Sequence, residues 1–135
     1  MTAPILPHIP KGGFWYLLSP YTRHPRGMGR AYAEALIALA YLTEFRHHVY
    51  SPIVHSHDLS FAMPVSMRED HGFWIALQTP FMAKADGALL LQLDGWEASK
   101  GVAEEIDYFT LRGVPFASLR PDDIPDFETR VHTIP

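Results

Sequence analysis

Two glutamates lie about one turn into a predicted helix that follows a largely apolar segment. Residues 87–93 are typical of a strand, and residues 100–112 have helical spacing that ends before Gly113. Backbone N–H groups at the start of a helix attract an anion, and ligands of open α/β sheets bind beyond the carboxyl ends of the strands. Glu104 and Glu105 are both placed to point at such a ligand, and the residues alone leave both as candidates.

Ser99 and Gly101 stand at the start of the same predicted helix. The Ser99 hydroxyl is placed to cap the helix by accepting a backbone N–H two or three residues on. Gly101 has no side chain, so a phosphate or sugar oxygen can approach the helix end closely. A cap alone and a cap beside a ligand are both compatible with this pattern.

A second group of polar residues, His55-Ser56-His57-Asp58, follows a predicted strand. Three interpretations stay open: a metal site, hydrogen bonding to a base or sugar, and a loop that caps itself through Ser56 and Asp58. A metal site needs three or four converging ligands, and a His-x-His pair supplies at most two. We therefore expect no metal, although other histidines could join this pair, namely His47, His48 and His71.

Glycine-rich phosphate motifs are absent from the sequence. It has neither a G-x-G-x-x-G segment between a strand and a helix nor a G-x-x-x-x-G-K-[ST] segment, which excludes the common dinucleotide and P-loop fingerprints. Arg23, Arg26 and Arg30 follow the first predicted strand and could meet a phosphate instead. An ordinary charged loop is an equal alternative for these arginines.

The elements that position these residues alternate between strand and helix. Strands are predicted at residues 14–18, 49–54, 87–93 and 114–119, and helices at 30–47, 72–84 and 100–112, with Pro80 as a kink or a new first turn. Residues 1–12 and 121–135 are left as irregular ends of a single domain. Unbroken apolar strands alternating with helices are typical of an α/β protein with a parallel sheet covered on both faces.

Chain topology then predicts where the polar residues meet. Right-handed crossovers place the ends of the first three strands at one edge, which gathers Ser19, His55, Asp94 and Ser99 around one crevice.

Composition narrows the class of protein. The 135 residues carry a formal charge of −4, with 11 basic and 15 acidic side chains, which disfavours coating of a nucleic-acid polymer. With no cysteine, the chain has neither disulfides nor thiolate chemistry. The first 12 residues contain three prolines and no signal-length apolar run, and no segment is long enough to cross a membrane. We expect a cytoplasmic protein.

Two segments resemble the nucleoside 2-deoxyribosyltransferase superfamily. Residues 16–21, Tyr-Leu-Leu-Ser-Pro-Tyr after Gly12-Gly13, are similar to its Tyr-Leu-Ala-Gly-Pro-Tyr opening. Ser99-x-Gly101-x-x-x-Glu105 resembles its Ser-x-Gly-x-x-x-Glu signature. The similarity covers roughly residues 13 to 119 and is closest to the 2′-deoxynucleoside 5′-monophosphate N-glycosidases and related small bacterial and phage proteins.

The resemblance implies a flavodoxin-like or Rossmann-like three-layer fold with a sheet of four or five strands. It also implies cleavage of the bond between a nucleobase and its sugar, without a cofactor. By this mapping Glu105 rather than Glu104 is the nucleophile, Tyr16 orients it, and Ser99 with nearby N–H groups holds a 5′-phosphate. A carboxylate suits this chemistry because the transition state resembles an oxocarbenium ion.

Two positions depart from the family pattern. Gln78 stands where the family carries an aspartate, and glutamine cannot deliver a proton; Ala98 replaces an aspartate before the signature serine. Asp94, at the end of its strand, is a possible substitute acid or base. We place Ser19, His55, Ser99, Gly101, Gln78 and Arg30 around the substrate.

Two rival functions follow from these departures and from the histidines. A nucleotide-binding protein without turnover fits Gln78 and Ala98. A metal-dependent hydrolase using His55, His57 and Asp58 ranks last. We expect a small nucleotide or nucleoside as the partner and a homodimer or larger homo-oligomer, because relatives assemble in this way and Phe73, Trp74 and Phe81 could form an apolar patch.

Overall fold

The computed structural model describes residues 3–135 and contains one four-stranded sheet. Its strands are all parallel and lie in the order β2-β1-β3-β4, so the expected α/β fold with a parallel sheet is confirmed. The elements, in chain order, are β1 (Trp15–Leu18), α1 (Met28–Glu44), β2 (Val49–Tyr50), α2 (Pro52–Phe61), α3 (Val65–Arg68), α4 (His71–Lys84), β3 (Gly87–Leu91), the 3-10 turn η1 (Trp96–Ala98), α5 (Lys100–Arg112), β4 (Phe116–Leu119), the 3-10 turn η2 (Pro121–Asp123) and α6 (Phe127–Val131).

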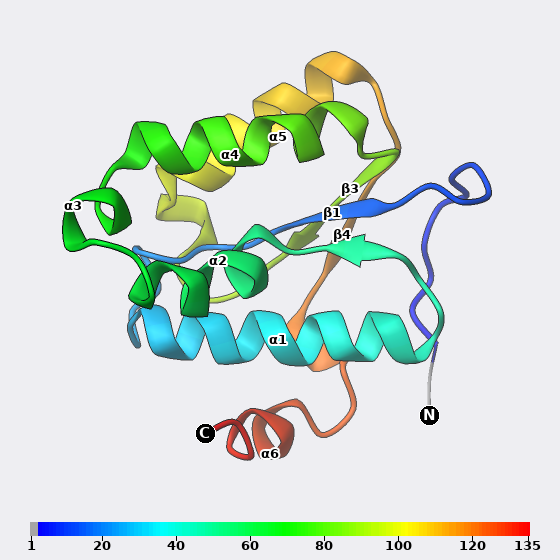
Figure 1. Ribbon diagram of the computed structural model, residues 1–135. Coiled ribbons are helices and arrows are strands. Elements are labelled where there is room, and N and C mark those ends of the chain that lie inside the picture. The colour runs from blue at the N-terminus through cyan, green and yellow to red at the C-terminus, as the bar shows by residue number, and fades with distance from the viewer. Residues whose placement is uncertain (1–2) are drawn as a thin grey trace.

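Helices cover both faces of the sheet (Figure 1). Helices α4 and α5 lie above it, and α1 and α6 lie below it. Strand β1 divides its side chains between the two layers: Trp15 and Leu17 pack toward α1 and α6, whereas Tyr16 and Leu18 pack toward α4 and α5. The alternation follows from the two-residue period of a strand, and it yields the three-layer architecture of flavodoxin-like and Rossmann-like folds.

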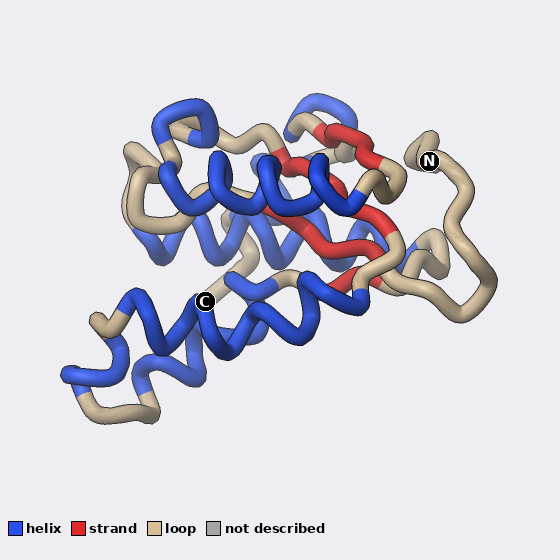
Figure 2. The backbone as a smooth tube through the Cα atoms, turned by 90° about the horizontal axis from the view of Figure 1, so that it is seen from above, coloured by secondary structure: helices blue, strands red, loops and turns tan. Residues whose placement is uncertain are grey.

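The carboxyl ends of the strands meet at one side of the molecule. There the chain runs through α2 and α3, and α3 projects past the strands in both views (Figures 1 and 2). At the other side, the Arg112 guanidinium at the end of α5 donates to the carbonyls of Met82 and Ala85, both at 2.7 Å. These two bonds fix α5 against the end of α4.

The second strand is shorter than predicted. Strand β2 ends at Tyr50, and residues 52–61 form α2 instead of the end of a strand and a loop. Ser51 caps the helix, because its hydroxyl accepts the Val54 N–H at 3.2 Å, and Pro52 occupies the first helical position. Proline is favourable there, since its fixed φ suits a helix and its missing N–H would have no partner. The Ser-Pro pair therefore starts a helix, and the strand predicted over residues 49–54 is confirmed only at Val49 and Tyr50.

Two further predictions need correction at finer scale. The last segment, predicted to be irregular from Pro121, contains α6, whose Phe127 and Val131 are buried against the α1 layer. Their spacing of four residues is the signal that was missed.

Pro80 lies inside α4, which continues through it to Lys84. None of the helices formed by residues 3–135 has the length and apolar character needed to cross a bilayer.

Candidate functional site

Tyr16 and Glu105 come together between the sheet and its upper helix layer. Tyr16, in the middle of β1, is completely buried, and its phenol interacts with the Glu105 carboxylate as a hydrogen-bond partner. Strand β1 supplies the first residue and α5 the second, so the spatial meeting required by the sequence interpretation is present. Glu104, the other candidate, is exposed and faces Lys100 at 4.0 Å.

Burial dominates the electrostatics of this pair. It raises the pKa of Glu105 to about 7, while the hydrogen bond from Tyr16 lowers that pKa and the neighbouring charge of Glu104 raises it. Burial likewise raises the pKa of Tyr16, and the Glu105 carboxylate raises it further. The phenol therefore stays protonated and donates, whereas the carboxyl group titrates near neutral pH. An acid with this property is suited to catalysis.

A few buried polar side-chain atoms have no hydrogen-bond partner in the part of the chain that the structure describes. Among residues 3–135 these atoms are Glu105 Oε2, Ser19 Oγ and Arg30 Nε. An unpaired buried polar atom costs roughly 1–3 kcal/mol, so a ligand that bonds to it recovers this free energy. Arg30 Nε lies 3.2 Å from a Glu34 oxygen and is compensated electrostatically. Glu105 and Ser19 remain, and both are residues that sequence analysis places at the site.

Gln78 of α4 reaches the same phenol. The Tyr16 hydroxyl lies 3.5 Å from Gln78 Oε1, so the amide oxygen accepts a long hydrogen bond from the phenol. Because a phenol has one proton, Gln78 and Glu105 compete for it, and a charged carboxylate is the stronger acceptor. Gln78 therefore joins the site through Tyr16.

Tyr50 is a site residue that sequence analysis missed. In the sheet it pairs in register with Tyr16, and the two rings lie 5.7 Å apart. Burial raises the Tyr50 pKa to about 12, with a further contribution from the Glu105 carboxylate. Its ring stacks on Phe81 at 4.1 Å, and His55 of α2 lies 5.8 Å from it. No motif singles out Tyr50; only the strand register reveals it.

Ser99 and Gly101 lie as predicted at the start of α5. The Ser99 hydroxyl accepts the Val102 N–H at 3.2 Å, which is the expected cap. A side chain at Gly101 would meet only Ser99 Oγ, at 3.9 Å, so the space beside this helix end is open.

Arg30 does not face this site. Its Nη2 donates to both Glu128 oxygens, at 2.6 and 2.8 Å, and its Nε approaches Glu34. The buried His24 ring bonds to Glu34 as well. These contacts tie the loop after β1 and α1 to α6, and they engage the guanidinium that was predicted to meet a phosphate.

Asp94 also lies outside the Tyr16–Glu105 site. It lines a groove of about 460 Å³ with Glu34 of α1 and Glu128 of α6, on the lower side of the sheet. Neither Tyr16 nor Glu105 lines this groove. The buried Leu93 packs into the lower core layer, and Asp94 follows it after the strand has ended. The expected single crevice is thus divided, and Asp94 lies apart from the carboxylate it was expected to assist.

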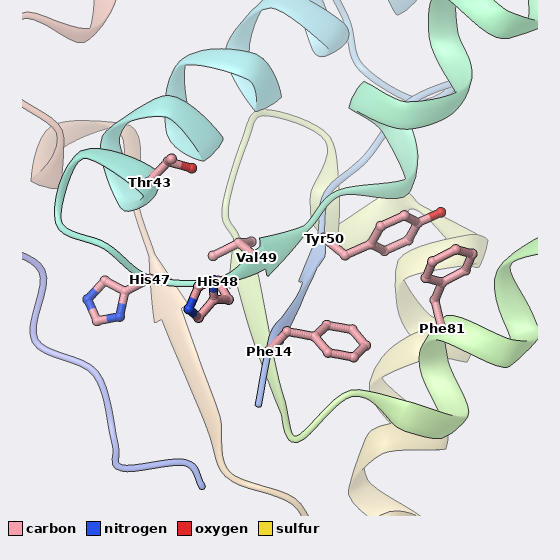
Figure 3. Close-up of a pocket in the computed structure, with 7 residues that line it drawn as sticks. All are labelled: Phe14, Thr43, His47, His48, Val49, Tyr50 and Phe81. Atoms are coloured by element: carbon pink, nitrogen blue, oxygen red, sulfur yellow. The ribbon is translucent and has the colours of Figure 1, made fainter. Parts of the chain in front are cut away.

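A second groove, of about 410 Å³, lies beside the edge strand β2 (Figure 3). Its walls are Phe14, Thr43, His47, His48, Val49, Tyr50 and Phe81. Tyr50 and Phe81 stand face to face in this view, with the Tyr50 hydroxyl directed away from the strand. Neither Tyr16 nor Glu105 is among the residues that line this groove.

The His55-x-His57-Asp58 segment lies on α2 and does not converge. Residues two apart on a helix point about 200° apart. His55 accordingly faces Tyr50, whereas His57 accepts or donates a 2.6 Å bond with Tyr21 and stacks on Tyr32 of α1 at 4.3 Å. Within residues 3–135 no three His, Cys, Asp or Glu side chains are grouped so that they could hold a metal ion.

Comparison with known families adds one finding. Residues 13–119 match a family described as Domain of unknown function (DUF1937). The chain belongs to the DUF1937 family. The match runs from the residue before Phe14 to the last residue of β4, so the DUF1937 domain includes Tyr16, Tyr50, Gln78 and Glu105 and leaves out α6. No curated protein matches the chain.

Proposed function

We propose that this DUF1937 protein cleaves the N-glycosidic bond of a nucleoside or nucleotide with Glu105 as the nucleophile. One observation carries the proposal: a buried carboxylate on α5 with an unpaired oxygen lies against a buried phenol from the central strand β1 of a parallel sheet. The resemblance of the Tyr16 and Ser99–Glu105 segments to nucleoside 2-deoxyribosyltransferases supports the same chemistry.

The proposed reaction has two steps. A Glu105 carboxylate oxygen bonds to the anomeric carbon as the bond from that carbon to the nucleobase breaks, and the base leaves with the electron pair. Water then attacks the glycosyl ester and releases the carboxylate; attack by a second base would instead give transfer. The carboxylate stabilises positive charge that develops on the sugar, and the Tyr16 hydrogen bond orients it.

Substrate binding is proposed at the residues around this pair. The α5 N-terminus with Ser99 and Gly101 would take a 5′-phosphate, His55 and Gln78 would contact base or sugar, and Ser19 offers an unpaired hydroxyl. Arg30 and Asp94 are left out of this proposal. Arg30 is paired with Glu34 and Glu128, and Asp94 lines a groove beside these two residues on the other side of the sheet.

The test is a panel of nucleosides and their 5′-monophosphates, with released base measured by chromatography. We expect release of base from some member of the panel, and loss of at least about 1,000-fold in rate in Glu105→Gln. Glu104→Gln, which changes the neighbouring exposed carboxylate, should keep its rate. No free base from any substrate, or full activity in Glu105→Gln, would contradict the proposal.

A second candidate is nucleotide binding without turnover. It is favoured by Gln78, whose amide stands beside Tyr16 where an acid would be expected to supply a proton. Calorimetry that shows nucleotide binding, together with no product after long incubation, would support this candidate over catalysis.

A further inference from the structure

The proposed cleavage needs a proton for the departing base, and the position of Gln78 does not supply one. Gln78 ends in an amide, and Asp94 lines a groove that contains neither Tyr16 nor Glu105. Tyr16 is occupied, because its single proton is shared between Glu105 and Gln78. A different donor must therefore serve the leaving group.

We infer that Tyr50 is this donor, and the inference rests on the proposed function. Strand register sets Tyr50 beside Tyr16, and the Tyr50 ring lies near enough to Glu105 for the carboxylate charge to act on its hydroxyl. The ring is fixed by its stack on Phe81 at 4.1 Å and 3°, and its hydroxyl points away from the strand (Figure 3).

Protons and electrons balance when Tyr50 and Glu105 act together. As the glycosidic bond breaks, the base nitrogen keeps the electron pair and takes the Tyr50 proton, while a Glu105 oxygen bonds to the anomeric carbon. Water then attacks that carbon, gives a proton to the Tyr50 phenolate and frees the Glu105 carboxylate. Both side chains return to their starting state.

Glu105 also adjusts the donor during the reaction. Its negative charge raises the pKa of Tyr50 before the reaction begins. Once the carboxylate has formed an ester it is neutral, so this contribution disappears and the phenol becomes more acidic as the leaving base needs its proton. The same geometry therefore keeps Tyr50 protonated at rest and favours proton release in the transition state.

The experiment varies the leaving group in wild type and Tyr50→Phe. Substrates range from basic nucleobases to an aryl deoxyriboside that releases 4-nitrophenolate, which departs without a proton. The variant should lose roughly 100-fold or more with basic nucleobases, and the loss should fall to within about threefold for the aryl substrate. The substitution keeps the ring and its stack on Phe81, and thermal unfolding checks that the fold persists.

Other outcomes would overturn the inference. An equal loss with all leaving groups would make Tyr50 a packing residue, and a leaving-group-dependent loss in His55→Asn but not in Tyr50→Phe would move the donor to α2. Tyr41→Phe, a phenol in the lower core layer, should keep the wild-type rates. If the wild type cleaves no member of the series, the proposed function fails and this inference fails with it; if only the Tyr50 pattern is absent, Glu105 catalysis stands.

Discussion

The ionised Glu105 carboxylate serves the proposed reaction, but its burial lowers the free energy of unfolding. Its carboxyl group is buried beside a phenol and carries one oxygen without a partner. A pKa raised from 4.5 to about 7 means that the folded protein holds a proton that the unfolded chain releases. The full shift corresponds to about 3 kcal/mol, reached above both pKa values.

Removing this charge should therefore stabilise the protein in a pH-dependent way. The wild-type free energy of unfolding should fall between about pH 4.5 and 7, as ionisation of Glu105 begins to cost free energy in the folded state. Glu105→Gln should exceed the wild type in stability at pH 8, and its advantage should be about 2 kcal/mol smaller at pH 5. Urea unfolding at the two pH values measures this. A Glu105→Gln protein with no pH-dependent advantage, or the same advantage in the exposed control Glu104→Gln, would contradict the account.

Tyr16 should hold the Glu105 pKa down. Its hydrogen bond favours the ionised carboxylate, so Tyr16→Phe should raise that pKa above about 7, by roughly one unit. NMR titration of ¹³C-labelled glutamate side chains reports the change directly. A pKa that stays constant or falls would show that the phenol does not bond to the carboxylate. Tyr108→Phe, which lies on α5 beside Phe109, is the matched control.

At the scale of elements, the sequence predicts α5 well and α2 poorly. The apolar spacing, the Ser99 cap and Gly113 define α5, and these local signals agree with its packing. Residues 49–54 carry apolar and aromatic side chains that suit a strand, yet the strand ends at Tyr50 because Ser51 and Pro52 start a helix. The position of Tyr50 beside Tyr16 depends on strand register, which a single sequence does not specify.

The loop after β1 and the loop after β3 approach each other closely at Gly95. Gly95 has φ +90°, and a Cβ there would stand 2.4 Å from the Arg23 carbonyl oxygen. Gly95→Ala should lower the free energy of unfolding by about 3 kcal/mol or more, from clash and backbone strain together. Gly113→Ala shares a positive φ, +69°, but meets no atom within 4 Å, so it should cost only about 1–2 kcal/mol. If urea unfolding shows equal losses of stability in Gly95→Ala and Gly113→Ala, the close approach to Arg23 does not add to the cost of the substitution.

At the scale of the whole molecule, the layered α/β architecture follows from the alternation of apolar strands with amphipathic helices. That alternation does not predict that the polar residues after the strands lie in separate regions. His24, Glu34, Arg30 and Glu128 form contacts between residues distant in sequence, and these contacts draw Arg30 to the lower side, in the region where Asp94 lines a groove. Charged residues near a predicted strand end thus have partners that spacing alone cannot identify.

Self-association remains a prediction at this scale. Phe61 and Val65 are 58% and 56% exposed at the end of α2 and the start of α3. Phe81, by contrast, is stacked on Tyr50 and is not a free surface residue. We expect sedimentation to give about twice the mass of a 15.3 kDa chain, with Phe61→Asp shifting it toward one chain. Leu111→Asp, at a 90% exposed position on α5, should not change the mass. A wild type that sediments as one chain would contradict this expectation.

The most direct measurement of the central claim is the covalent state of Glu105 during turnover. The protein would be mixed with the best substrate of the panel, quenched in acid and digested, and its peptides fragmented in a mass spectrometer. We predict the added mass of one glycosyl group on Glu105, resolved from Glu104 in the same peptide, and none in Glu105→Gln. A glycosyl group on any other residue, or continued turnover in Glu105→Gln, would contradict the account.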